Sequence, residues 1–180
     1  MRISPAILAG ATAMISGPYF SAATEHDAPL TLSPLLPDDC PPLAAAIVAM
    51  EPWSVMNYPA DRLGEFLVTP DGGVTRCLIE VGGEKAGVIA VRYPWLKGPY
   101  LELLALLQPF QGKGIGGTLL ERFENEAVSR ESRNLFVCAS SFNERALRFY
   151  RRHGFRDLAV LPGLVAEGYD EILLRKCPLG

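Results

Sequence analysis

The sequence has few of the side chains that bind metal ions or form disulfide frameworks. It contains only two histidines, His26 and His153, which lie far apart, and four cysteines. None of the cysteines belongs to a C-x-x-C pair, the spacing that is typical of zinc sites and redox motifs. We therefore expect reduced, partly buried thiols and no metal site.

An excess of basic residues is also missing. The 180 residues include 17 Lys and Arg against 20 Asp and Glu, which gives a formal net charge of −3 at pH 7. This balance creates no general attraction for nucleic acid or anionic membranes, so neither is expected as a partner. Apolar residues make up 49% of the chain and charged residues 21%, which is typical of a globular protein.

The N-terminal segment contains almost no charge. No charged residue lies between Arg2 and Glu25, and prolines and glycines interrupt the apolar run. We interpret residues 1–29 as an extension and residues 30–180 as the folded domain. A cleaved signal peptide is the alternative, but only one basic residue precedes the apolar run, and the prolines and glycines weaken a membrane-spanning helix. A cytoplasmic location is therefore favoured.

From residue 30 onward, hydrophobic patterns predict an alternation of strands and helices. The expected order is β-α-α-β-β-β-α-β-α-β-β. Two nearly continuous apolar strands, at 101–107 and 135–139, indicate burial on both faces. Antiparallel strands come first and strand–helix–strand crossovers follow. The predicted fold class is therefore mixed α/β (α+β), with a central sheet flanked by helices.

A glycine-rich loop, GKGIGG at residues 112–117, separates the first of these apolar strands from a helix. It matches the G-x-G-x-x-G fingerprint of dinucleotide-binding folds, but no carboxylate ends the next strand to hold a ribose. It also lacks the G-K-[ST] ending of a Walker loop. Converging N–H groups at a helix N-terminus still suit a pyrophosphate such as that of coenzyme A. A turn whose glycines serve only backbone geometry is the alternative.

Two segments resemble motifs A and B of the GNAT acyltransferase superfamily. Motif A is a buried strand, then Q/R-x-x-G-x-G/A, then a helix, and Gln111, Gly114 and Gly116 match its fixed positions. Within residues 140–155, the residues that match motif B are Asn143, Ala146, Tyr150, Gly154 and Phe155. A looser likeness in element order extends over residues 30–176.

The resemblance implies a GNAT-like fold in which two parallel strands splay apart to form a cleft for acetyl-CoA, with no metal involved. Backbone groups near Leu106 and Leu107 would pair with the pantetheine arm. Asn143 would bind the pantetheine or orient the following helix. The loop that would hold the pyrophosphate consists of Gln111, Gly112, Lys113, Gly114, Ile115, Gly116, Gly117 and Thr118.

Two residues are candidate catalysts. By its place in motif B, Tyr150 would protonate the departing thiolate, although core packing is the alternative for a tyrosine on an amphipathic helix. Glu102 is the lone carboxylate in an apolar strand, and burial there would make it a better proton acceptor. A glutamate that faces solvent or pairs with an arginine is the equally supported alternative.

The acceptor site is less defined by the sequence. By the resemblance, the first two helices and the last strands would form it, and the candidates are Glu51, Trp53, Tyr58, Asp61, Tyr169, Asp170 and Glu171. Carboxylates there would attract a cationic amine. The predicted activity is acetyl transfer from acetyl-CoA to an amine of a small molecule or to a protein N-terminus, by direct attack in a ternary complex. A non-catalytic acyl-CoA-binding or regulatory module is the alternative, and a homodimer is left open.

Overall fold

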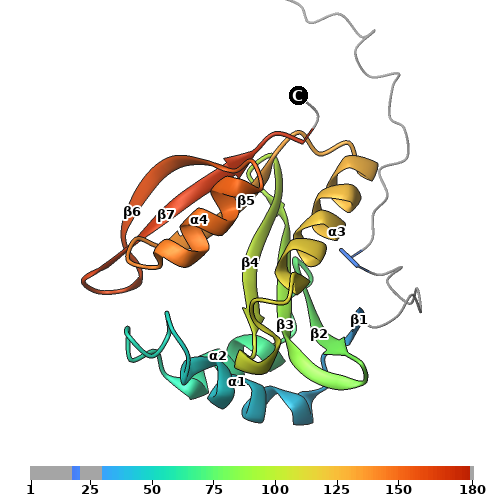
Figure 1. Cartoon of the computed structure of the whole chain (residues 1–180), viewed down its shortest axis with the longest axis vertical. Helices are drawn as coiled ribbons and strands as arrows, with labels where there is room; N and C mark the ends of the chain where they lie inside the picture. The colour runs from blue at the N-terminus through green and yellow to red at the C-terminus, as the bar shows by residue number, and fades with distance from the viewer. Residues whose placement is uncertain (1–17, 21–29, 179–180) are drawn as a thin grey trace, which may run out of the picture.

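The computed structural model describes residues 18–20 and 30–178, which form a seven-stranded sheet with helices on both faces (Figure 1). The strands are β1 (Leu30–Pro34), β2 (Val74–Val81), β3 (Glu84–Trp95), β4 (Gly98–Leu106), β5 (Leu135–Ser140), β6 (Arg156–Ala166) and β7 (Tyr169–Lys176). The helices are α1 (Cys40–Val48), α2 (Ala60–Val68), α3 (Ile115–Ser129) and α4 (Glu144–Arg152), with short 3-10 helices η2 (Pro37–Asp39) and η3 (Gln108–Phe110). The predicted element order and fold class are confirmed.

The strand order is β1-β2-β3-β4-β5-β7-β6, and every neighbouring pair is antiparallel except β4 and β5. The parallel pair is short, because only Tyr100 with Phe136 and Leu101 with Val137 are in register. Beyond these two positions the strands separate. The predicted splay between the two apolar strands is therefore present in the fold.

A β-bulge explains where β4 turns away from β5. In the pairing with β3, Leu101 lies opposite Val91 and Leu103 lies opposite Ala90, so Glu102 is the extra residue on β4. A bulge bends its strand and increases the local twist. The bend comes directly after Leu101, which is the last residue of β4 that pairs with β5.

Two hydrophobic clusters hold the helices against opposite faces of the sheet. Helices α1 and α2 contribute Ile47 and Leu63 to a cluster with β2, β3 and β4. Helices α3 and α4 contribute Phe123 and Leu147 to the other cluster, which also contains Val137 of β5. Each fully buried side chain of this size contributes about 1.5–3 kcal/mol relative to exposure, so both layers are firmly attached.

Three residues that the sequence assigned to the N-terminal extension pack against α3. Tyr19 is 1% exposed and its ring lies 4.2 Å from the guanidinium carbon of Arg130. The Phe20 N–H group donates to the Glu126 carboxylate at 2.8 Å, and burial raises the pKa of Tyr19 to about 12. The contact of this short segment with the domain was not anticipated from the sequence. The remainder of the extension lies outside the described residues.

Two further sequence expectations concern membranes and metals. In the described ranges, no helix is long and apolar enough to cross a membrane. The same residues contain no group of three or more His, Cys, Asp and Glu side chains arranged to hold a metal ion.

Candidate active site

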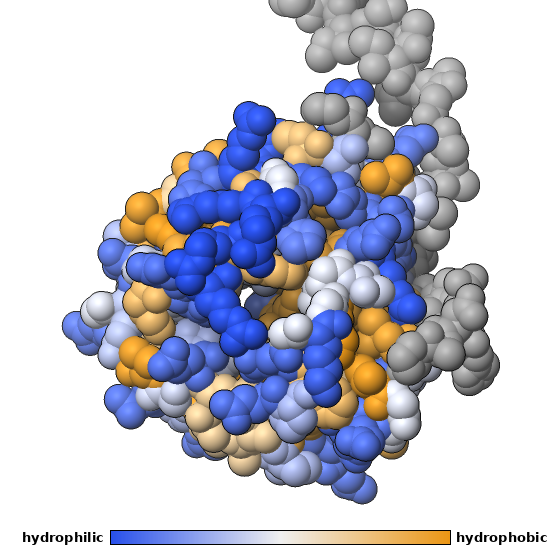
Figure 2. All heavy atoms as spheres, in the orientation of Figure 1, coloured by the Kyte–Doolittle hydropathy of each residue, from blue (hydrophilic) through white to orange (hydrophobic). Residues whose placement is uncertain are grey.

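A cavity of about 1160 Å³ opens where β4 and β5 separate. Its wall includes the loop before α3, one side of α4, the separated strand edges, β7 and the segment between α1 and α2. Figure 2 shows a hollow between the regions of α3 and α4, with hydrophobic residues visible inside a hydrophilic rim. Ligand pockets usually measure roughly 300–1,000 Å³, so this cavity has room for two substrates together.

The glycine loop presents a row of backbone N–H groups at one end of the cavity. Gly112 and Gly114 have φ values of +75° and +83°, a conformation that glycine adopts without strain. Among the described residues, the N–H groups of residues 112–116 have no hydrogen-bond acceptor. The N-terminal end of α3 adds its partial positive charge, so the loop has the properties of a phosphate site.

The row of available N–H groups is shorter than predicted at both ends. At its start, the Gln111 N–H group donates to the carbonyl oxygen of Gln108 at 3.2 Å. The N–H groups of Gly117 and Thr118 both donate to the carbonyl oxygen of Gly114, at 2.9 and 3.2 Å. These two N–H groups close the first turn of α3, although both residues line the cavity. The N–H groups available for a pyrophosphate therefore end at Gly116.

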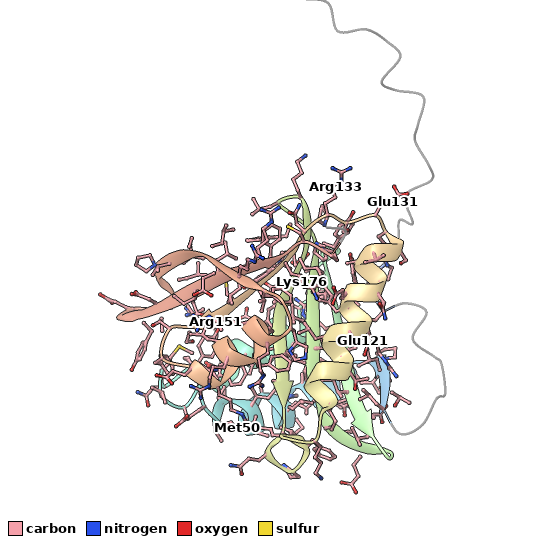
Figure 3. All side chains as sticks on the ribbon, turned by 45° about the horizontal axis from the view of Figure 1, so that its top comes forward. Met50, Glu121, Glu131, Arg133, Arg151 and Lys176 are labelled. Carbon is pink, nitrogen blue, oxygen red and sulfur yellow. The ribbon has the colours of Figure 1, made fainter. Side chains whose placement is uncertain are left out.

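Gln111 fixes the position of the loop. Its Nε2 donates to the carbonyl oxygen of Leu106 at 2.8 Å, and its Oε1 accepts from Nη1 of Arg145 at 2.9 Å. Met50, which follows α1 and is labelled in Figure 3, places its Sδ 3.7 Å from the same Nε2. One side chain thus connects the loop with β4, α4 and the end of α1.

The edge of β4 that faces β5 carries unpaired backbone groups. Leu107 N–H donates to Ala86 of β3 at 2.8 Å, so Leu107 faces the opposite edge from the one expected. Because backbone groups alternate along an antiparallel strand, those of Leu104 and Leu106 point toward β5. The carbonyl oxygen of Leu106 is occupied by Gln111. Leu104 was not identified from the sequence, because the alternation depends on the register.

Helix α4 begins at Asn143 and places Tyr150 in the cavity wall. The Asn143 side chain accepts from Ala146 N–H at 3.0 Å, so it caps the helix, which is one of its two predicted roles. Tyr150 is 7% exposed, lines the cavity and packs on Phe155. Burial raises the pKa of Tyr150, so its hydroxyl group keeps its proton well above neutral pH.

The arginines of α4 divide into two groups. Arg145 and Arg152 line the cavity. Arg148 pairs with Glu144 at 2.7 Å, and Arg151, labelled in Figure 3, pairs with Asp157 at 2.6 Å. Sequence reasoning missed Arg145, although its spacing of seven residues from Arg152 places both on one face of the helix.

Glu102 is paired with an arginine. Its Oε2 lies 3.1 Å from Nε of Arg92, and Nη2 of Arg92 donates to its Oε1 at 3.1 Å. Arg92 also contacts Asp71 at 3.1 Å. Of the two interpretations left open by the sequence, the structure has the glutamate that pairs with an arginine. Glu102 still lines the cavity.

Glu171 is the more deeply buried carboxylate of the cavity wall. It is 4% exposed, and its Oε1 accepts from the hydroxyl group of Ser140 at 2.6 Å. Burial raises the pKa of Glu171, while the hydrogen bond from Ser140 partly opposes this. The sequence placed Glu171 among acceptor residues and did not distinguish it from its neighbours.

The acceptor candidates are only partly brought together. Glu51, Trp53, Tyr58 and Glu171 line the cavity, whereas Asp61, Tyr169 and Asp170 do not. Tyr169 instead donates its hydroxyl group to the carbonyl oxygen of Val55 at 3.0 Å, which ties β7 to the α1–α2 segment. The cavity residues that sequence reasoning did not list for the acceptor include Met56, Trp95, Tyr100, Cys138 and Ser140.

Comparison with known families and proteins agrees with this geometry. A model described as the acetyltransferase (GNAT) family matches residues 39–155. An uncharacterized N-acetyltransferase of Methanocaldococcus jannaschii is 35% identical over 98 residues, which cover 54% of this chain and 62% of that protein. Streptothricin acetyltransferase of Streptomyces lavendulae is 30% identical over 141 residues, which cover 73% of this chain and 75% of that protein.

Solved structures share the fold at lower sequence identity. A GNAT-family acetyltransferase from Desulfovibrio desulfuricans has a TM-score of 0.66 and 21% identity, and covers 83% of this chain and 99% of that one. A GNAT acetyltransferase from Elizabethkingia anophelis was solved with acetyl-CoA bound. It has a TM-score of 0.60 and 20% identity, and the match covers 82% of this chain and 97% of that one.

Proposed function

The chain belongs to the acetyltransferase (GNAT) family, and from that premise we propose that it transfers an acetyl group from acetyl-CoA to an amine. The observation that carries this proposal is the row of N–H groups of residues 112–116 at the mouth of a cleft between separated parallel strands. Such a row suits the pyrophosphate of coenzyme A, and the cleft suits its extended arm.

The donor side of the cavity fits the remaining parts of acetyl-CoA. The backbone groups of Leu104 and the N–H group of Leu106 face the cleft, where they can pair with the amide groups of the pantetheine arm. A backbone N–H group directed at the thioester oxygen would stabilise the negative charge that develops during attack. Arg145 and Arg152 line the same end and supply positive charge near the phosphates.

The reaction would proceed by direct attack. The amine nitrogen forms a bond with the thioester carbonyl carbon, the carbon–sulfur bond breaks, and the products are an amide and a thiol. Tyr150 would donate its proton to the departing sulfur. Glu102, the proton acceptor proposed from the sequence, is ion-paired with Arg92, and this pairing gives less support to that role.

A small-molecule amine is the acceptor class that the cavity supports best. Trp53 and Tyr58 line it together with Glu51, Glu102 and Glu171, a combination of aromatic faces and carboxylates that favours a cation. The relative from Streptomyces lavendulae is named for the small molecule streptothricin. A protein N-terminus stays the second candidate. A cytoplasmic location and a homodimer stay predictions.

Two measurements separate this proposal from a non-catalytic acyl-CoA-binding module. Calorimetry with acetyl-CoA tests the donor site, and release of coenzyme A with a panel of primary amines tests the transfer. We expect micromolar binding and amine-dependent release. Binding of acetyl-CoA without turnover on any amine would support the donor site but contradict catalysis. Failure to bind acetyl-CoA would contradict both the donor site and catalysis.

A further inference from the structure

We infer that Glu171 accepts the proton of the attacking amine and that Ser140 positions its carboxylate. This inference rests on the proposed acetyl transfer and assigns its proton acceptor. Glu171 lies directly opposite Ser140 in the β5–β7 pair, is 4% exposed, and lines the cavity. The 2.6 Å hydrogen bond from Ser140 occupies Oε1 and leaves Oε2 for a ligand.

Among the described residues, Glu171 differs from the buried Asp39 and from the half-buried Glu102 in having no positively charged partner. Buried Asp39 pairs with Lys85, and Glu102 pairs with Arg92. Within the described ranges, no Lys, Arg or His forms an ion pair with Glu171. A buried carboxylate without a cation is unfavourable unless it binds a proton or meets a positive ligand. A cationic amine in the cavity would provide the positive charge that Glu171 lacks.

The sheet places Glu171 on the acceptor side of the cleft. Residues that are paired on neighbouring strands share a face, so Ser140 and Glu171 lie on the face that also carries Tyr100 and Phe136. Sδ of Met56 lies 3.9 Å from Oγ of Ser140, so the segment between α1 and α2 reaches the same face.

Tyr150 approaches from the other face. It packs with Val137 and Leu174, in the cluster that attaches α3 and α4 to the sheet. The opening between β4 and β5 joins the two faces, and both Tyr150 and Glu171 line it. A thioester in this opening therefore has a proton donor on one face of the sheet and a proton acceptor on the other.

Burial raises the pKa of Glu171, and its nearest titratable neighbours are uncharged. The titratable groups that interact with it are Cys138 on β5 and Tyr100 on β4, and both keep their protons because burial raises their pKa values. The residue opposite Glu171 on β6 is Leu161. The other titratable or charged groups of the cavity wall are Glu51, Tyr58, Glu102, Arg145, Tyr150, Arg152 and His153.

The proton movements balance. A cationic amine that enters the cavity first loses one proton to water; the neutral amine then attacks the carbonyl carbon, and its nitrogen carries one proton too many. Glu171 takes this proton as the carbon–nitrogen bond is completed, while the sulfur receives a proton from Tyr150 when the carbon–sulfur bond breaks. Glu171 subsequently loses its proton to water and Tyr150 regains one, so the net products are an amide and a thiol.

The test is the pH dependence of kcat/KM for three variants, with an amine that the wild type acetylates. We expect Glu171→Gln to lower kcat/KM by about 10²-fold or more and to remove from the pH profile the low-pH fall that comes from this carboxyl group, leaving only the fall that comes from protonation of the amine. Ser140→Ala should move this fall to higher pH, because it removes a hydrogen bond that lowers the pKa of Glu171. Glu102→Gln, a matched change in the same cavity, should retain the low-pH fall in kcat/KM that comes from Glu171.

Calorimetric binding of acetyl-CoA shows whether each variant is folded, since neither Glu171 nor Ser140 is assigned to the donor. Glu171→Gln with kcat/KM within about threefold of wild type and an unchanged pH profile overturns the inference and leaves acetyl transfer intact.

A titration that needs no acceptor provides the second readout. The carboxyl carbon of Glu171, labelled with carbon-13 and assigned by its loss in Glu171→Gln, should titrate above the usual glutamate range and shift further upward in Ser140→Ala. Titration within the usual range, with no response to Ser140→Ala, contradicts the inference even if no amine is acetylated by the wild type.

Discussion

The two ends of the cavity are built in different ways. The donor end consists largely of backbone groups, from residues 112–116 and from the edge of β4. The acceptor end consists of side chains from the α1–α2 segment, β4, β5 and β7. A backbone site keeps its geometry when side chains change, whereas converging side chains can be changed one at a time. We therefore expect the donor end to define the reaction and the acceptor end to define the amine.

The largest effect among the donor-side changes is expected for Tyr150→Phe. Loss of the hydroxyl group removes the proposed acid but leaves the buried ring, so kcat should fall by about 10²-fold with little change in acetyl-CoA affinity. Steady-state kinetics and calorimetry measure the two quantities. An equal fall in affinity would mean that Tyr150 serves donor binding, and unchanged kcat would mean that sulfur leaves without an acid.

Gly114→Ala should lower the affinity for acetyl-CoA without changing the acceptor end of the cavity. A side chain at φ +83° costs about 1–2 kcal/mol of backbone strain. If the loop shifts to relieve this strain, its N–H groups move away from the phosphates, and acetyl-CoA should bind roughly tenfold more weakly. Gly168→Ala is the matched control, because Gly168 has the same φ and nothing within 4 Å of the added Cβ, but lies outside the cavity wall. Equal acetyl-CoA affinity for both variants would argue against a pyrophosphate at this loop.

Arg145→Ala should have a smaller effect on the same end. Removal of one charge near the phosphates and of the bond to Gln111 should weaken acetyl-CoA binding by about fivefold, more at low salt than at high salt. Arg148→Ala changes an arginine on the same helix that pairs with Glu144 outside the cavity. Similar losses in the two variants would indicate a general charge effect of α4.

The smallest effect is expected at the acceptor end, for Trp53→Ala. Loss of an aromatic face that contacts a cation costs about 0.5–1 kcal/mol at exposed sites, so KM for the amine should rise by roughly threefold. The affinity for acetyl-CoA should stay the same. Val55→Ala, in the same segment but outside the cavity wall, is the control. A change in acetyl-CoA affinity would show that the two ends are not independent.

The same contrast explains how much could be predicted from the sequence. The donor loop is contiguous, so Gln111, Gly114 and Gly116 could be proposed from their match to motif A of the GNAT superfamily. The element order followed from hydrophobic patterns, because each helix and strand is long enough to show its period. The helix capped by Asn143 was also predictable, since capping depends on residues three positions apart.

The acceptor end depended on information that is not local. The ion pair of Glu102 requires that β3 places Arg92 beside it, and the buried bond between Ser140 and Glu171 requires the register of β5 with β7. Leu107 was assigned to the cleft because the register of β3 with β4 was unknown. Likewise, Tyr19 contacts α3 across more than 100 residues of sequence, a distance over which local patterns carry no information.

A crystal structure with coenzyme A bound tests the central claim most directly, namely that donor and acceptor meet from opposite faces of the sheet where β4 and β5 separate. We expect the pyrophosphate to lie about 3 Å from the N–H groups of residues 112–116. The sulfur atom should lie in the opening, beside the Tyr150 hydroxyl group and across from Glu171. Coenzyme A bound outside the cleft, or with its sulfur away from Tyr150, would contradict the account.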